Sequence, residues 1–214
     1  MNSIPANGYI WPLNSSPDDM SPLFNFSWII VLLLAGTAEK PASWSIDATH
    51  SKIGFKVRHL GISSVRGEFA AYDAAITMDP ENLESIQASV TIEIASIDTK
   101  NDRRDNHLRS DDFFSAETFP TMTFESTGVT SVDGASFALA GNLTIRDVTK
   151  EVVLHGEFLG TAAMGDSERA GFEARTKVNR LEYGLMWNRL TEAGGAVVGH
   201  DVEIILDLEL IKDD

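Results

Sequence analysis

The stretch "HSKIGFKVRHLG", His50–Gly61, carries the pattern that decides the fold. Apolar residues at positions 53, 55 and 57 alternate with Lys, Gly and Lys at positions 52, 54 and 56. This period of two is typical of a β-strand with one dry face and one wet face. The same parity places His59 on the apolar side. Such a histidine could be a reactive group, a metal ligand or a polar residue at the mouth of a cavity, and a hydrogen-bonded structural role is the default.

The same alternation recurs along the chain after residue 41, separated by turn-forming residues. The predicted strands include residues 86–94 and 202–210, with weaker patterns at 65–78, 121–129, 137–145, 152–158 and 171–178. Counting gives about eight strands. Antiparallel strands with one dry face must close into a barrel or pair as a sandwich, because an open sheet would leave that face in water.

One polar segment, residues 99–114, breaks the strand pattern. Thr99 and Asp102 have the spacing of a capping box, and Leu108 can pack inward, so we expect a short helix over one end of the barrel. Asp105 is expected to keep this helix solvated. No repeat or linker divides residues 41–214, which indicates one domain.

The first forty residues resemble an export signal more than a folded segment. Leu23–Ala35 is an apolar run of the length of a signal-peptide core, and Gly36 and Ala38 give the small-x-small spacing of a cleavage site. The residues upstream contain no Lys or Arg, which is atypical. We expect residues 1–40 to be signal-like or non-globular and the protein to be periplasmic or secreted; an uncleaved anchor and a different start site are the alternatives.

Composition excludes several classes of function. The formal net charge of -15 argues against nucleic acid and against anionic membrane surfaces as partners, since both require a basic surface. The 214 residues contain no cysteine, which excludes disulfides and thiol chemistry. At this length the chain buries a substantial core without such cross-links.

No motif for chemistry is present. The histidines are His50, His59, His107, His155 and His200, and none belongs to an H-x-H or H-E-x-x-H pattern. There is also no G-x-S-x-G motif and no phosphate-binding glycine loop. Parity places His200 on the same side as Val202 and Ile204, and turns His155 outward. We therefore predict no catalytic residue, no metal site and no cofactor.

Five blocks of the sequence, in order, resemble the YceI-like family of polyisoprenoid-binding proteins. They are "WSIDATHSKIGFKVRHLGISSVRGEF" (Trp44–Phe69), "LRSDDFFSAETFPTMTFES" (Leu108–Ser126), "LAGNLTIRDVTKEVVL" (Leu139–Leu154), "NRLEYG" (Asn179–Gly184) and "VGHDVEIILDLEL" (Val198–Leu210).

The resemblance implies an all-β fold: an extended, antiparallel, eight-stranded lipocalin-like β-barrel with a short helix. It further implies a long apolar channel that holds an isoprenoid chain, in bacterial proteins that are commonly periplasmic. An eight-stranded barrel is wide enough for one small ligand. The acidic N-terminal segment and a long polar connection at residues 160–171 depart from the family pattern.

Parity on the predicted strands selects the candidate channel lining, for which a filled core is the alternative. The candidates are Ile53, Phe55, Val57, Phe69, Ile92, Ile94, Phe124, Leu139, Leu143, Phe158, Phe172, Ile204 and Leu206. The polar end of a prenyl lipid needs hydrogen-bond donors at the mouth, and the candidates are His59, Arg58, Arg103, Arg104 and Arg180.

The predicted function is non-enzymatic binding, transport or sequestration of an isoprenoid lipid, either polyprenyl or quinone-like. Two alternatives stay open: an enzyme that acts on a lipid-like substrate through scattered His and acidic residues, and a filled barrel that binds a partner. The chain length and head group of the lipid are also open, as is the oligomeric state, including a homodimer.

Overall fold

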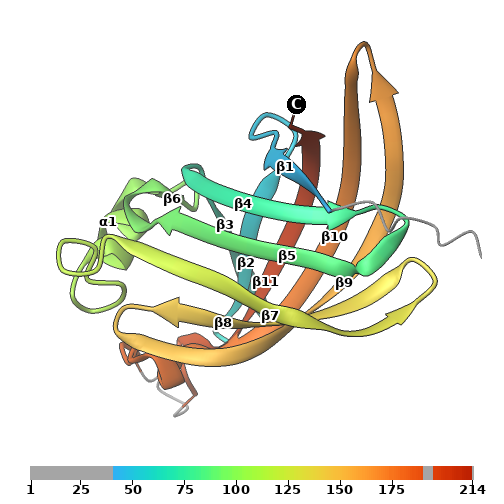
Figure 1. Ribbon diagram of the computed structural model, residues 1–214. Helices are drawn as coiled ribbons and strands as arrows, with labels where there is room; N and C mark the ends of the chain where they lie inside the picture. Colours follow the sequence, from blue (N-terminus) through green and yellow to red (C-terminus); the bar gives the residue numbers. More distant parts are fainter. Residues whose placement is uncertain (1–40, 190–194, 214) are drawn as a thin grey trace, which may run out of the picture. The chain divides into compact units, whose positions relative to one another are not determined.

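Figure 1 shows the computed structural model, which describes residues 41–189 and 195–213. The predicted signal-like segment, residues 1–40, lies outside the described residues, so export stays a prediction. No helix in the described part of the chain is long and apolar enough to cross a membrane.

Strands make up most of the described chain. They are β1 (Ala42–Ile46), β2 (Lys52–His59), β3 (Ser63–Phe69), β4 (Tyr72–Asp79), β5 (Asn82–Glu93), β6 (Ile97–Asp98), β7 (Thr121–Asp133), β8 (Ser136–Ile145), β9 (Val148–Met164), β10 (Ser167–Asn179) and β11 (Val198–Lys212). The described helices are α1 (Asp102–Arg109) and the short 3-10 helices η1 (Ile94–Ser96) and η2 (Arg180–Tyr183).

The strands form a closed antiparallel barrel. β1 and β2 both pair antiparallel with β11, so they are two halves of one interrupted strand. β3 and β4 form a second interrupted strand, because β3 pairs with β2 and β4 pairs with β1. β5 and β6 form a third, because β6 pairs with β3 and β5 pairs with β4. The three interrupted strands, β1 with β2, β3 with β4 and β5 with β6, are followed by the five strands β7 to β11. Together they form the predicted eight-stranded barrel, which is confirmed.

The ring closes where β1 meets both β4 and β11. Ile46 lies opposite Leu210, and Trp44 lies opposite Ile76 on its other edge. The Trp44 side chain is fully buried, and its indole N–H donates to the carbonyl oxygen of Met78 at 3.3 Å. Closure leaves no open edge at this seam, because backbone hydrogen bonds and buried side chains join the first strand to the last.

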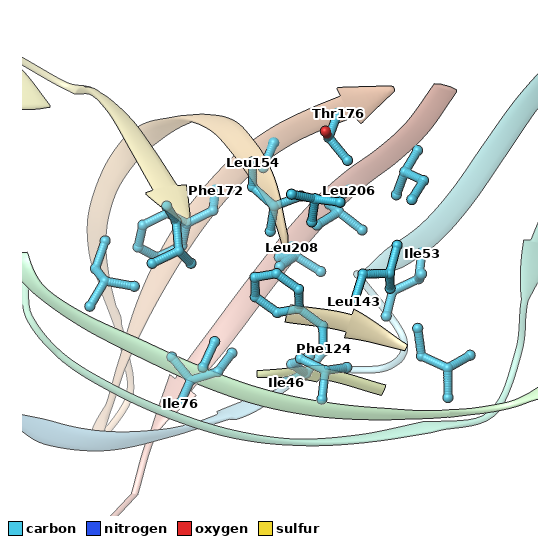
Figure 2. A pocket seen from close by; sticks show the side chains of 18 of the residues that line it. Ile46, Ile53, Ile76, Phe124, Leu143, Leu154, Phe172, Thr176, Leu206 and Leu208 are labelled. Carbon is cyan, nitrogen blue, oxygen red and sulfur yellow. The ribbon is translucent and has the colours of Figure 1, made fainter. Parts of the chain in front are cut away.

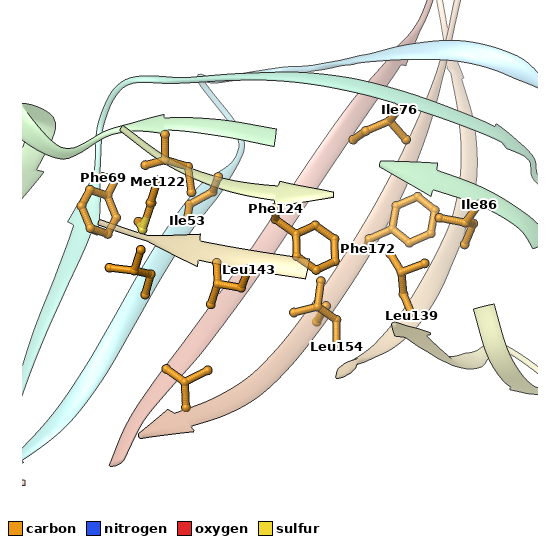
Figure 3. Packing of buried hydrophobic residues seen from close by; sticks show 14 of the residues in the cluster. Ile53, Phe69, Ile76, Ile86, Met122, Phe124, Leu139, Leu143, Leu154 and Phe172 are labelled. Atoms are coloured by element: carbon orange, nitrogen blue, oxygen red, sulfur yellow. The ribbon is translucent and has the colours of Figure 1, made fainter. Parts of the chain in front are cut away.

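Inward-facing phenylalanines lie over glycines in the barrel wall, within the packing of buried residues shown in Figure 3. A Cβ atom built on Gly67, Gly141 or Gly156 would lie less than 3.0 Å from a phenylalanine ring. In β9, the ring that covers Gly156 belongs to Phe137, its direct partner on β8. The missing side chains let the rings lie against the wall, which leaves space along the barrel axis.

Gly156→Ala is expected to destabilise the barrel by about 1–3 kcal/mol, because the new methyl group must displace the Phe137 ring. Urea unfolding measures this loss. Gly54→Ala is the matched control, since its nearest non-neighbour atom would lie 3.5 Å away. Phe137→Leu combined with Gly156→Ala should restore part of the loss, and strictly additive effects would contradict the packing described.

Two local predictions are wrong. The residues 160–171 are mostly strand rather than a long connection, because β9 and β10 continue as a hairpin that turns at Gly165. The α1 helix is capped by Asn101, whose side chain accepts a hydrogen bond from the Arg104 N–H, and not by Thr99.

Asp105 is buried rather than solvated. Its carboxylate accepts hydrogen bonds from the backbone N–H and the hydroxyl group of Thr99, which ties α1 to the chain that precedes it. Figure 1 shows α1 at one end of the barrel, as predicted.

Candidate functional site

The barrel encloses a dry cavity of about 150 Å³. Figure 2 shows side chains such as Phe124, Phe172 and Leu206 pointing into it from different strands. Among the described residues that line this cavity, Thr176 alone has a polar side-chain atom. Alternation on every strand produces this surface, because the inward residue at each second position is apolar. The cavity can hold a hydrocarbon but offers almost no hydrogen bonds.

A second apolar cavity, of about 100 Å³, adjoins the first. Phe55, Phe69, Met122 and Ile204 line both cavities, so these side chains separate one from the other. The second cavity reaches Leu108 of α1. We use the word channel for the two cavities together.

The channel ends at a polar opening beside α1, which we term the mouth. The second cavity shares Phe55, Val57, Leu108, Phe113 and Val198 with this opening. The polar side chains of the mouth and its tryptophan are Arg58, His59, Asn101, Arg103, Arg104, His107, Trp187 and Arg189.

The mouth is basic. None of the described residues that line it is Asp or Glu. Arg58 and Arg103 are exposed and form no ion pair with a described residue. Arg104 is held in place by hydrogen bonds of 2.7 Å to the hydroxyl and the carbonyl oxygen of Thr99. These cations lie where a polar group at the end of a bound chain would emerge.

An aromatic cluster forms one side of the mouth. The His107 ring lies edge-on to Phe113 and Trp187, with centroids 5.1 and 4.8 Å apart. Its Nε2 atom is 2.8 Å from a carboxylate oxygen of Asp112. The Arg189 guanidinium lies 6.0 Å from the centre of the Trp187 ring. Trp187 follows η2, in a stretch without period-two alternation, so no sequence pattern identified it.

Arg180 is part of the wall rather than of the mouth. Its side chain is 4% exposed, and the guanidinium donates to the carbonyl oxygens of Leu185, Trp187, Val198 and Gly199. Burial lowers the pKa of this group. The side chain joins the chain after η2 to the start of β11, although it also borders the second cavity.

The structure places most of the predicted lining residues around the first cavity. Those that border it are Ile53, Phe55, Phe69, Ile92, Phe124, Leu139, Leu143, Phe172, Ile204 and Leu206. Val57 borders the second cavity and the mouth. Ile94 is buried in η1 and borders neither cavity, and Phe158 packs on Phe172 with ring centroids 5.0 Å apart. Contact of these residues with a lipid stays a prediction.

The two inward histidine predictions have different outcomes. His59 lines the mouth, and its ring makes no hydrogen bond with a described residue, which leaves its nitrogens free for a ligand. The prediction for His200 is wrong, because this residue is exposed. The β11 register against β2 shifts between Val198 and Val202, and that irregularity breaks the parity. His155 is exposed as predicted.

The described residues contain one group with metal-ligand geometry, and cations of the protein already occupy it. Asp47, His50 and Glu209 each offer one possible ligand atom, and these three atoms lie within 4.8 Å of one another. However, the Arg169 guanidinium bridges Asp47, at 2.7 Å, and Glu209. His50 Nδ1 is 3.0 Å from the same Asp47 carboxylate oxygen. We interpret this network as structural, since it fastens the interruption between β1 and β2 to β10 and β11.

Asp47→Asn is expected to reduce stability in a pH-dependent way. Hydrogen bonds from His50 and Arg169 hold the pKa of Asp47 well below its usual range, and the Asp47 bond raises the pKa of His50. The network therefore stabilises the fold above about pH 4 and weakens as the pH falls toward the lowered pKa. It also weakens as the pH rises through the raised pKa of His50.

Urea midpoints measured from about pH 2 to about pH 9 test this expectation. The difference between wild type and Asp47→Asn should be largest between about pH 5 and about pH 6 and shrink in acid. Asp207→Asn is the control, because Asp207 is exposed and forms no ion pair with a described residue. A difference that does not vary with pH would contradict the proposed role of the network.

Comparison with known proteins gives a consistent result. The sequence model described as "YceI-like domain" matches residues 44–210. A UPF0312 protein of Staphylococcus aureus is 37% identical over 163 residues, which are 75% of this chain and 92% of the relative. The crystal structure of a Campylobacter jejuni YCEI protein has a TM-score of 0.65 at 35% identity, and the match covers 79% of this chain and 97% of that one.

A polyisoprenoid binding domain from Saccharophagus degradans shares the fold, with a TM-score of 0.56. At 17% identity, over 80% of this chain and 99% of that one, its similarity concerns the fold alone.

Proposed function

Because the chain belongs to the YceI-like family, we propose that it binds an isoprenoid lipid in its channel and carries or sequesters it without chemical change. The observation that carries this proposal is the row of an apolar cavity, a second apolar cavity that shares lining residues with it, and a basic mouth that shares lining residues with the second. A domain described as polyisoprenoid binding has the same fold, which is therefore compatible with such a ligand.

Burial of the hydrocarbon supplies the affinity. Each CH₂ group moved from water into an apolar site contributes about 0.8 kcal/mol, so one five-carbon isoprene unit contributes about 4 kcal/mol. Loss of freedom on binding offsets part of this gain. A few units inside the channel are therefore enough for useful affinity, and the uniformly apolar lining accepts any prenyl chain that fits.

The polar end of the lipid would lie at the mouth. The His59 ring makes no hydrogen bond there with a described residue, and the exposed guanidinium groups of Arg58 and Arg103 form no ion pair with one. These donors suit either the hydroxyl or phosphate end of a polyprenyl lipid or the carbonyl oxygens of a quinone-like ring. Export to the periplasm or beyond belongs to the same proposal and is supported by the apolar run that precedes the barrel.

Catalysis on the lipid would have to take place outside the first cavity, because the described lining of that cavity offers no ionisable group. His59→Ala is expected to weaken lipid binding several-fold at most. Product analysis of a bound prenyl lipid after prolonged incubation separates the two functions. Chemical conversion by wild type that disappears in His59→Ala would contradict a carrier role.

Solvent extraction of protein purified without detergent, followed by mass spectrometry, tests the ligand class. We expect a prenyl-chain species in the extract. An empty extract, together with no uptake of added polyprenol, would overturn the proposal.

A further inference from the structure

The tip of the β2–β3 hairpin exposes two large apolar side chains. Ile62 is 85% exposed and Leu60 is 43% exposed. The Leu60 N–H donates to the carbonyl oxygen of Val197, a residue that lines the mouth, at 2.9 Å. The apolar tip is therefore fixed to the edge of the mouth.

The turn conformation makes Leu60 an unusual residue at this position. Leu60 and Gly61 have φ angles of 53° and 72°, and the Ile62 N–H donates to the carbonyl oxygen of His59. A turn with positive φ at both central residues favours Asn and Gly, and a bulky residue there costs free energy. Because Leu60 is also substantially exposed, packing in the barrel recovers little of that cost.

A third exposed apolar residue is the direct neighbour in sequence of a residue that lines the same opening. Met186 is 64% exposed and directly precedes Trp187 of the aromatic cluster. Tryptophan is enriched where proteins meet the interface of a bilayer, because its ring is apolar and its N–H is polar. Exposed apolar side chains thus belong to two chain segments that border an opening whose charged side chains are arginines.

The charge of the mouth contrasts with that of the whole chain. The formal net charge is -15, yet the mouth carries Arg58, Arg103, Arg104 and Arg189 and no described Asp or Glu. A negatively charged chain is repelled from an anionic surface unless a basic face is turned toward it. The expectation from total charge alone, which disfavours anionic membranes, neglects this local arrangement.

We propose that the mouth docks on the surface of a bilayer that contains anionic phospholipids. Leu60, Ile62 and Met186 would enter the interfacial layer, while the arginines contact lipid phosphates. Docking in this orientation would let a prenyl chain pass between bilayer and channel without crossing water. That consequence rests on the proposed function, whereas the docking itself needs no bound lipid.

The absence of cysteine allows a position-specific test in the full chain. Ile62→Cys carries an NBD fluorophore, and Met164→Cys, at the exposed tip of the β9–β10 hairpin, is the matched control. Figure 1 shows that hairpin at the end of the barrel away from α1. On phosphatidylglycerol vesicles, emission from position 62 should shift to shorter wavelength and be quenched by brominated acyl chains. Pure phosphatidylcholine vesicles should produce neither effect.

Arginine replacements test the electrostatic part. Arg58→Gln and Arg103→Gln should each lower the vesicle partition coefficient of the labelled Ile62→Cys protein about fivefold, since one cation near an anionic surface contributes about that factor. Arg175→Gln, an exposed residue outside the mouth, should leave the coefficient unchanged.

The proposal is overturned if the label at position 62 stays in water on anionic vesicles, or if the label at position 164 responds equally. It is also overturned if the mouth arginines and Arg175 have the same effect. Uptake of polyprenol from detergent micelles, measured on the unlabelled protein, is independent of these results. Docking without uptake would refute the proposed function alone, and uptake without docking would refute this inference alone.

Discussion

Ala174→Phe is expected to abolish lipid binding while the barrel stays folded. Ala174 lies on β10 between Gly156 and Leu206, and its side chain borders the first cavity. A phenyl ring there would occupy the space that a prenyl chain needs. Exclusion of one isoprene unit removes about 4 kcal/mol of burial free energy, or roughly three orders of magnitude in affinity. Titration with a polyprenol in detergent micelles measures the change.

Ala75→Phe provides the matched control, because Ala75 is exposed on β4 and the same substitution there adds the ring outside the barrel. Circular dichroism and the thermal midpoint establish that both variants are folded. Overpacking by Ala174→Phe is expected to cost about 1–3 kcal/mol of stability. A folded Ala174→Phe protein that binds polyprenol as tightly as wild type would place the ligand outside the channel.

Arg180→Ala is expected to cause the largest loss of stability of any single arginine replacement discussed here. The substitution leaves the carbonyl oxygens of Leu185, Trp187, Val198 and Gly199 without their donor. Each buried acceptor without a partner costs about 1–3 kcal/mol of stability. Removal of the buried guanidinium charge offsets part of the total cost for the four carbonyl oxygens, so we expect a net loss of about 3 kcal/mol. Urea unfolding measures it.

The contrast with Arg175→Ala identifies the cause. Arg175 lies on β10, the strand that leads into η2. It is exposed and makes no side-chain hydrogen bond with a described residue, so its loss should change stability by less than about 0.5 kcal/mol. If Arg180→Ala kept wild-type stability but lost polyprenol binding, Arg180 would be a ligand contact and the structural interpretation would be wrong.

Local alternation was sufficient to predict about eight strands and which of their residues face inward, because a strand with one dry face places its side chains by parity. It left a barrel and a sandwich open, and the family resemblance decided for the barrel. Ile53, Phe124 and Leu206 lie on three different strands, yet all border the cavity as parity predicts. The same rule failed at His200, where a register shift between β11 and β2 changed which side faces inward. Such register shifts depend on how a strand pairs with its neighbour, so the sequence of the strand itself gives little indication of them.

The mouth was only partly predictable. Arg58 and Arg103 were candidates by position, but Trp187 and Arg189 come from the chain after η2, which has no periodic pattern. Arg180 was proposed as a mouth residue, whereas its four carbonyl partners hold it in the wall. Assigning a residue to the mouth or to the wall requires the positions of loops that are distant in sequence. Tertiary packing determines those positions.

Native mass spectrometry of lipid-free protein mixed with a polyprenol tests the central claim, binding of a prenyl chain inside the channel, most directly. The account predicts that wild type and Ala75→Phe gain the mass of a single polyprenol and that Ala174→Phe gains none. The absence of a complex with wild type, or an equally abundant complex with Ala174→Phe, would contradict it.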